Sequence, residues 1–231
     1  MMAELRQFRN RAQAGKLLAK ALGAWAHQPE AIVLGLPRGG VPVAFAVAMT
    51  LGLELDILLV RKLGLPGQPE YAIGAVGRGG VQVLQPGVPG LMGITQEQVD
   101  AIAARELLEI ERRTRLYRGG RAPPVLADRV VIIVDDGIAT GSTMLAAVEV
   151  ARRHAARRVV VAAPVAPPDT LAALAPLADE VVCLATPLRF RAVSQWYEAF
   201  DQTGDEEVQD LLAMAWRSGA ERPPGAQAKQ P

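Results

Sequence analysis

Two adjacent carboxylates, Asp135 and Asp136, stand directly after five apolar residues at 130–134 and before a loop at 137–143. The loop carries two glycines and three hydroxyl side chains, and a helical stretch follows from Met144 to Arg153. A strand–loop–helix unit presents free backbone N–H groups and the positive end of a helix dipole at the loop, which makes an anion site. Carboxylates instead suit hydroxyl groups, a cation or developing positive charge. The stretch therefore predicts a phosphate in the loop with a polyol or metal beside it, as in a phosphorylated sugar.

The residues of this loop exclude two common phosphate-binding motifs. A Walker A loop places Gly-Lys before its Ser or Thr, whereas Gly141 is followed directly by Ser142. A dinucleotide-binding loop needs the spacing G-x-G-x-x-G, and this loop lacks it. Gly141 lets the backbone approach a ligand closely, and Ser142 or Thr143 is the expected N-cap of the helix.

Residues 131–143 resemble the signature of type I phosphoribosyltransferases, which has four apolar residues, two acids, a short loop and Thr-Gly-x-Thr. The resemblance implies that Asp135 and Asp136 hold the ribose 2- and 3-hydroxyls of phosphoribosyl diphosphate. It also implies that the loop holds the 5-phosphate through Ala139, Thr140, Gly141, Ser142 and Thr143. A buried strand with a turn and a helix cap would explain one acid and one threonine, but not both acids and three hydroxyls.

A second strand–loop–helix unit runs from a strand at 31–36 through Pro37, Arg38, Gly39 and Gly40 into a helix at 41–51. Glycines allow backbone N–H groups to converge on an anion, and an arginine can clamp it with two hydrogen bonds. Pro37-Arg38-Gly39 is similar to the Ser-Arg-Gly loop of adenine phosphoribosyltransferases, which implies pyrophosphate binding there.

Two cations, Arg61 and Lys62, follow a strand predicted at 55–60. Two charged residues without a ligand role at the end of an ordinary strand would give the same sequence pattern. At the carboxyl edge of a parallel sheet they would face the two loops, and the resemblance implies that they reach pyrophosphate or a dimer interface.

The order of the remaining elements predicts an α/β fold: a doubly wound, mainly parallel sheet with helices on both faces. The expected elements are helices at 8–27, 95–117 and 170–177, strands at 158–165 and 179–184, a β-hairpin at 73–85 turning at 78–80, and a loop at 86–93. We expect one domain over 1–217, with a hairpin and helix insertion at about 63–121, a small C-terminal hood at about 186–217, and disorder over 218–231. In the family the hairpin closes over the site, but a helix as long as 95–117 departs from the family's short flexible loop.

Aromatic residues concentrate in the predicted hood. The resemblance implies that one of them stacks on the nucleobase, and Phe190, in a loop just past a strand, is the better candidate. Trp196 and Phe200 fit a helix packing on the domain. Five arginines near the end of the long helix are expected to be solvated, with Arg118 and Arg121 as exceptions that could reach pyrophosphate; the five are Arg112, Arg113, Arg115, Arg118 and Arg121.

The composition of the chain limits the classes of protein to which it can belong. The chain has 231 residues, 50% of them hydrophobic, and a net charge of +1, which gives no general case for DNA binding. A single cysteine, Cys183, excludes an internal disulfide and a cysteine-based zinc site. His27 and His154 lack ligand spacing and fall on predicted helices. We expect a soluble, cytoplasmic protein with neither a signal peptide nor a membrane span.

The resemblance implies a phosphoribosyltransferase of nucleotide salvage that joins phosphoribosyl diphosphate to a nitrogen base, with purines favoured, and releases pyrophosphate. Asp135, Asp136, Arg38 and Lys62 would be catalytic, and Mg²⁺ would bind through substrate and water rather than through direct protein ligands. Ala139 stands where 6-oxopurine enzymes carry a third acid, so that general base is missing. A homodimer is expected.

Two other functions fit the same residues. The fold could serve as a regulator that binds phosphoribosyl diphosphate without turnover and has an RNA or protein partner. It could also be a phosphohydrolase with Asp135 as nucleophile. Pyrophosphate release separates the first alternative from the enzyme, and phosphate release from simple esters separates the second.

Overall fold

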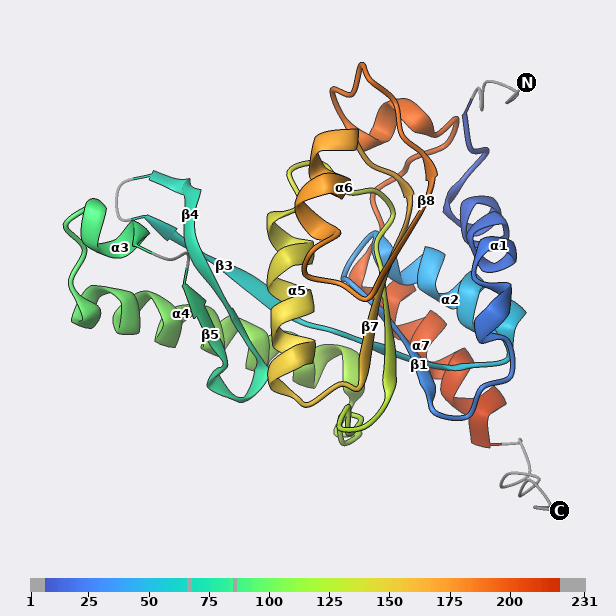
Figure 1. Ribbon diagram of the computed structural model, residues 1–231. Coiled ribbons are helices and arrows are strands. Elements are labelled where there is room, and N and C mark those ends of the chain that lie inside the picture. The colour runs from blue at the N-terminus through green and yellow to red at the C-terminus, as the bar shows by residue number, and fades with distance from the viewer. Residues whose placement is uncertain (1–6, 66–67, 85–86, 221–231) are drawn as a thin grey trace, which may run out of the picture.

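A five-stranded parallel sheet forms the centre of the computed structural model, which describes residues 7–65, 68–84 and 87–220. The strand order is β2-β1-β6-β7-β8 (Figure 1). The strands are β1 (Ala31–Gly35), β2 (Glu54–Ile57), β6 (Val130–Val134), β7 (Arg158–Val165) and β8 (Glu180–Ala185). All residues of β1 and β6 are buried, as expected for strands covered on both faces. The predicted α/β fold is confirmed.

Helices cover both faces of the sheet (Figure 1). One apolar cluster joins the sheet to α1 (Arg11–Ala21), α2 (Gly40–Leu51) and α7 (Asp205–Ala220), and a second joins it to α5 (Ser142–Arg153) and α6 (Pro168–Leu174). Because β1 and β6 are neighbours in the middle of the sheet, the two predicted ligand loops leave the same edge side by side.

Several helix boundaries differ from the prediction. The first helix ends at Ala21 and is followed by a short 3-10 turn, η1 (Gly23–Trp25), so His27 lies beyond it with a φ of 59°. The N-cap of α5 is Gly141, with a φ of 77° and no side-chain capping bond. The expectation of a Ser142 or Thr143 cap was wrong because the helix begins at Ser142, two residues before the predicted Met144, and the left-handed turn at Gly141 favours a glycine.

The insertion after β2 is a separate antiparallel sheet (Figure 1). It contains β3 (Val60–Leu65), β4 (Gln68–Gly77) and β5 (Gln82–Leu84), and β4 and β5 form the predicted hairpin around the 3-10 turn η2 (Arg78–Gly80). The strand predicted at 55–60 ends at Ile57, so Arg61 and Lys62 belong to β3 instead of a strand end in the main sheet. The predicted loop at 86–93 contains a short helix, α3 (Val88–Leu91); Gln85 and Pro86 lie outside the described residues.

The long helix α4 (Gln96–Arg118) begins with the predicted capping box, in which Thr95 and Gln98 bond reciprocally. Its C-terminal end is fixed to the sheet. Arg118 is buried in an ion pair with Asp56 at 3.0 Å, and the Tyr117 hydroxyl donates to Asp205 on α7. Burial raises the pKa of Asp56, and the Arg118 guanidinium partly offsets that effect.

The arginines at the end of α4 are partly solvated and partly packed against other parts of the protein. Arg112 is exposed, as expected. Arg118 contacts Asp56, and Arg121 lies 4.9 Å from the Trp216 ring centroid. Neither exception lines the cleft described below, and the suggestion that they reach pyrophosphate stays a prediction.

The C-terminal segment has two parts. Residues 186–204 carry the 3-10 turn η3 (Val193–Trp196) and meet the N-terminal segment, where Phe8 pairs with Tyr197. Helix α7 packs instead on α2, α4 and β2. Because α7 continues to Ala220, disorder from residue 218 was predicted too early; residues 221–231 lie outside the described part. Among the described residues, none of the helices is both long and apolar enough to cross a bilayer.

The buried Asp56–Arg118 pair yields a stability prediction. Asp56→Ala leaves the Arg118 charge buried without its carboxylate, so the free energy of unfolding should fall by about 3–5 kcal/mol in urea titrations. The matched control is Arg112→Ala, which breaks the more exposed pair with Glu109 and should cost about 0.5 kcal/mol or less. Equal effects of the two variants would contradict the anchoring role.

Candidate functional site

The first ligand loop, Pro37 to Gly40, packs directly against the two acids that follow β6. A Cβ atom added to Gly39 would stand 2.1 Å from Asp136 Oδ2, and one added to Gly40 would stand 2.7 Å from the Val134 carbonyl oxygen. Both positions therefore require glycine for reasons of space. The Pro37–Arg38 peptide bond is cis.

The second loop presents unused donors. In the part of the chain that the structure describes, the backbone N–H groups of 139–143 donate no hydrogen bond to protein. Ala139 and Thr140 are exposed, and the Thr140 and Ser142 hydroxyl oxygens lie 3.2 Å apart. Free amides at the start of α5, with hydroxyls beside them, form the geometry that binds a phosphate.

The paired acids sit in a protein environment that opposes their charge. Asp135 Oδ1 accepts a hydrogen bond from the Asp136 N–H at 2.9 Å. Burial, and then the negative charge of Asp136, hold the pKa of Asp135 well above its usual range. Burial also raises the pKa of Asp136, while a hydrogen bond from Arg11 lowers it. The acids therefore favour ligand groups that donate hydrogen bonds or carry positive charge.

A cleft of about 390 Å³ is lined by Leu36 and Pro37 but by neither of the two acids. Its lining includes Thr143 at the start of α5, four cations and one acid; the charged residues are Arg61, Lys62, Arg105, Arg113 and Glu106. Arg61 pairs with Glu106 at 2.9 Å and Arg113 pairs with Glu109 at 2.7 Å. Lys62 is exposed and, within the described residues, is in no ion pair. The excess of cations suits a multiply charged anion.

Two predicted site residues point elsewhere. Arg38 does not line this cleft; its guanidinium is turned toward Asp205 at 3.9 Å. That separation is long and the side chain is 36% exposed, so the contact contributes little. Phe190 is half-buried and packs on a small cluster that contains Val165 and Tyr197. Neither residue stands beside the acids in this conformation.

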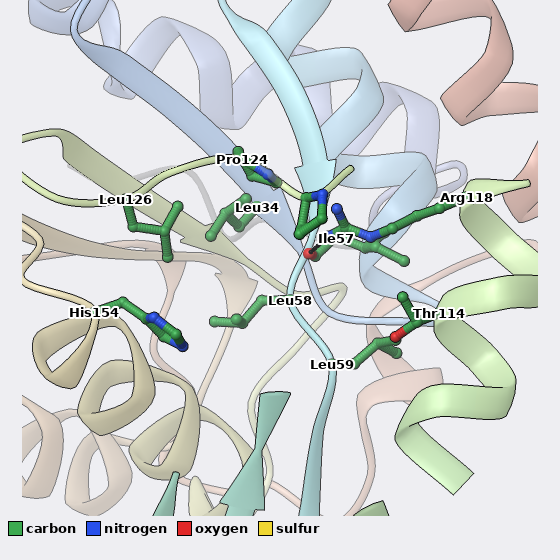
Figure 2. A pocket seen from close by; sticks show the side chains of 10 residues that line it. Leu34, Ile57, Leu58, Leu59, Thr114, Arg118, Pro124, Leu126 and His154 are labelled. Atoms are coloured by element: carbon green, nitrogen blue, oxygen red, sulfur yellow. Dashed lines mark hydrogen bonds between the residues drawn. The ribbon is translucent and has the colours of Figure 1, made fainter. Parts of the chain in front are cut away.

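A smaller cavity, of about 40 Å³, lies between the end of β2 and α4. Figure 2 shows the Arg118 side chain reaching from α4 toward Ile57, whose carbonyl oxygen it bonds at 3.0 Å, with Leu126 and His154 across the cavity. The volume is too small for a sugar phosphate and fits one or two water molecules. The contact instead fixes α4 as a wall of the larger cleft.

Sequence reasoning missed four residues that the fold brings to the site. Arg11, at the start of α1, bonds Asp136, and the Tyr197 hydroxyl donates to the Asp136 carbonyl oxygen at 2.5 Å. Arg105 and Arg113 reach the cleft from α4, although Arg113 was expected to be solvated with its neighbours. No local motif marks Arg11 or Tyr197, because each meets Asp136 only through tertiary packing.

The described residues contain no group of three or more His, Cys, Asp or Glu that could hold a metal ion. Two adjacent carboxylates remain near the loops. This donor set suits a Mg²⁺ ion carried by substrate oxygens and water, because Mg²⁺ keeps much of its hydration shell when it binds beside phosphates.

Comparisons with known proteins identify the family of the chain. The family model described as phosphoribosyl transferase domain matches residues 4–189. Proteins provisionally named phosphoribosyl transferases in two strains of Mycobacterium tuberculosis, CDC 1551 and H37Rv, are 49% identical over 217 residues, or 94% of this chain. The chain spans about half the length of these curated relatives, 49% of each. A crystal structure of the protein TT1426 from Thermus thermophilus is 46% identical, with a TM-score of 0.81, covering 90% of this chain and 98% of that one.

The raised pKa of Asp135 predicts how the melting temperature of the protein depends on pH. Its pKa is raised in the fold, so its favourable contribution is present below the unfolded pKa of about 3.8 and is lost as pH rises through the folded value. Asp135→Asn keeps an oxygen for the Asp136 N–H without the charge. Its melting temperature should exceed that of the wild type by a few degrees at pH 8, and the difference should shrink toward pH 5. The exposed Asp210→Asn is the control, and a lower melting temperature for Asp135→Asn at pH 8 would contradict the argument.

Proposed function

The chain belongs to the phosphoribosyl transferase domain family, and from that premise we propose that it transfers the 5-phosphoribosyl group of phosphoribosyl diphosphate to a nitrogen base and releases pyrophosphate. One observation carries the proposal. The loop at 139–143 carries free N–H groups, follows two acids whose charge is opposed by burial, and reaches the cationic cleft through Thr143. The substrate carries a 5-phosphate, ribose hydroxyls and a diphosphate, which are the kinds of group that the loop, the acids and the cleft suit.

The charges of the site suit departure of the diphosphate before the base attacks. As the C1–O bond breaks, the ribosyl carbon becomes positive and the leaving oxygen gains negative charge. Asp135 and Asp136 lie beside the ribose in this arrangement and favour the positive charge, while Lys62 and Arg61 favour the negative charge. The Gly39 amide extends the same stabilisation to the leaving group, whereas the Gly40 N–H already donates to the Leu36 carbonyl oxygen at 3.0 Å. Arg38 can join it because its contact with Asp205 is weak.

Mg²⁺ is part of the proposal. Bound to substrate oxygens near Asp135 and Asp136, it would neutralise charge on the diphosphate. Within the described residues, the protein supplies two carboxylates rather than a closed ligand set. The protein residues themselves orient the sugar and hold the diphosphate.

The acceptor is proposed to be a flat nitrogen base, with purines favoured. Ala139 is exposed at the position where 6-oxopurine enzymes of the family carry an acid, so this residue takes no proton from the acceptor. A base that attacks through a nitrogen lone pair needs no such acid. Aromatic rings of the segment at 190–200 lie beside Arg11 and Asp136 and offer a stacking surface.

A second candidate, a regulator that binds phosphoribosyl diphosphate without turnover, is favoured by one observation. Helix α4 stands where many family members have a short flexible loop, and it is anchored by Arg118 and Tyr117. A fixed wall excludes water less completely than a closing loop does. The phosphohydrolase alternative is weaker, because the family model that matches residues 4–189 describes a phosphoribosyl transferase domain.

Pyrophosphate release tests the proposal. The full chain, phosphoribosyl diphosphate and Mg²⁺ should release pyrophosphate with at least one member of a screen of purines, pyrimidines and simple amines. Asp135→Asn should lower kcat/KM by about 10²-fold or more, because it removes charge that stabilises the transition state. Asp210→Asn should match the wild type. Tight binding of phosphoribosyl diphosphate without pyrophosphate release from any acceptor would favour the regulator.

The α4 wall yields a separate prediction. Arg113 lines the cleft, whereas Arg112 bonds the same Glu109 but lies outside the cleft lining. Arg105→Ala combined with Arg113→Ala should raise the Kd for inorganic pyrophosphate by about tenfold or more, because two charge-assisted contacts are lost.

The Kd of ribose 5-phosphate should stay near the wild-type value in this double variant, because that ligand uses the 139–143 loop and the acids. Arg112→Ala is the matched control and should bind pyrophosphate as the wild type does. Equal weakening by Arg112→Ala would mean that only the general charge of α4 matters.

A further inference from the structure

Arg11 is held in one position by contacts with two distant parts of the chain. Its Nε donates to Asp136 Oδ2 at 2.7 Å, and its Nη1 donates to the Asp201 carbonyl oxygen at 2.7 Å. The guanidinium carbon lies 3.9 Å from the centroid of the Phe200 ring. The Arg11 side chain is only 12% exposed, so the guanidinium is a fixed part of the site rather than a surface charge.

The backbone also fixes the direction of Arg11. It is the first residue of α1, and the side chain of the preceding Asn10 accepts a hydrogen bond from the Gln13 N–H to cap the helix. Helix α1 packs so closely on α2 that a Cβ added to Gly15 would stand 2.6 Å from the Val43 carbonyl oxygen. The start of α1 is therefore set against the sheet, with Arg11 directed at the end of β6.

Asp136 is confined from several sides. Arg11 bonds its Oδ2, the Tyr197 hydroxyl bonds its carbonyl oxygen, and Gly39 leaves no room for a side chain beside it. Among the described residues, no side chain donates a hydrogen bond to Asp136 Oδ1. One carboxylate oxygen is thus held by protein, and the other remains for a ligand.

The two acids cannot both keep their charge at low cost without a cation. Like charges at adjacent residues repel each other, and burial weakens the solvation of both. Asp136 faces Arg11 from α1, Asp135 beside it and the Tyr197 hydroxyl from the segment after β8; Arg38 of the Pro37 loop is turned toward Asp205. Arg11 is therefore the only cation among the described residues that bonds to either acid.

We propose that Arg11 is a positioning residue that holds the Asp136 carboxylate by its Oδ2 and leaves its Oδ1 for the ribose hydroxyls of the substrate. The proposal rests on the proposed function, since it assumes that a ribose phosphate occupies the site. Arg11 acts through Asp136 and need not touch the substrate. It also connects the ribose acid to Phe200 and Asp201, in the segment where an acceptor base would stack.

Binding of two ligands distinguishes a positioning role of Arg11 from general damage to the site. Inorganic phosphate probes the 139–143 loop alone, and ribose 5-phosphate probes the loop together with the acids. Isothermal titration of the full chain should show that Arg11→Ala raises the Kd for ribose 5-phosphate by about tenfold or more. The Kd for phosphate should stay within about twofold, because its amide donors do not depend on Arg11.

The pH dependence gives a readout that a purely structural role would not change. Without Arg11, the pKa of Asp136 should rise, so binding of ribose 5-phosphate by Arg11→Ala should weaken steadily as pH falls from 8 to 6. Wild-type binding should change less over that range. Arg11→Lys should restore much of the affinity at pH 8, because it keeps the charge beside Asp136.

Two control variants complete the test. Arg9→Ala removes the same charge from an exposed neighbour and should bind both ligands as the wild type does. Phe200→Leu removes the ring under the guanidinium but leaves the ion pair, so it should weaken ribose 5-phosphate less than Arg11→Ala does. If Arg11→Ala fails to fold, Arg11→Gln carries the same test, because it keeps a long polar side chain at this position without the charge.

Unchanged or tighter binding of ribose 5-phosphate by Arg11→Ala would overturn the proposal, and tighter binding would show that Arg11 blocks the site. An equal loss of phosphate and ribose 5-phosphate at every pH would also overturn it, because Arg11 would then only support the fold. A wild-type chain that binds neither ligand would instead overturn the proposed function.

Discussion

The site depends on two negative charges that the fold places where solvation is poor. Asp135 and Asp136 follow a strand buried on both faces, and burial raises the pKa of both carboxyl groups. Three features of the protein surround these carboxylates. The backbone at Gly39 and Gly40 approaches them closely because neither residue has a side chain. The Asp136 N–H donates to Asp135, and Arg11 pairs with Asp136. One negative charge in excess of the nearby cation remains for a ligand to offset, which fits the proposed transfer, in which the sugar becomes positive.

The other half of the site has the opposite sign. Its cations come from β3 and α4, two elements of the insertion rather than of the main sheet. Helix α4 is fixed at its C-terminal end by the buried Arg118–Asp56 pair and along its length by Arg61–Glu106. The cleft is therefore formed before any ligand arrives, and less ordering is needed on binding than with a flexible loop. The same rigidity limits how far the wall can close over a reacting sugar.

The accuracy of the sequence predictions followed the range of the interactions involved. The strands at 130–134 and 158–165, the capping box at Thr95 and the hairpin around 78–80 were predicted correctly, because each depends on residues close in sequence. The errors came from contacts between distant residues. The pairing of Arg118 with Asp56, 62 positions away in the chain, was not predicted, and Arg61 looked like a strand end but lies within β3. The stacking role of Phe190 stays a prediction, and no signal in the sequence marked Phe200 as the ring that reaches Arg11.

The sequence by itself determined the fold class, the two ligand loops and their common edge of the sheet. Apolar periodicity, glycines and paired acids are local signals, and parallel strands bring their carboxyl ends together without further information. Only the tertiary structure decided which cations serve which acid and which line the cleft. That choice places Arg11 on Asp136, 125 positions away, Arg113 in the cleft and Arg112 outside its lining. The physical reason is that the partner of a long flexible side chain depends on how whole helices and strands pack against each other. No short stretch of sequence encodes that packing.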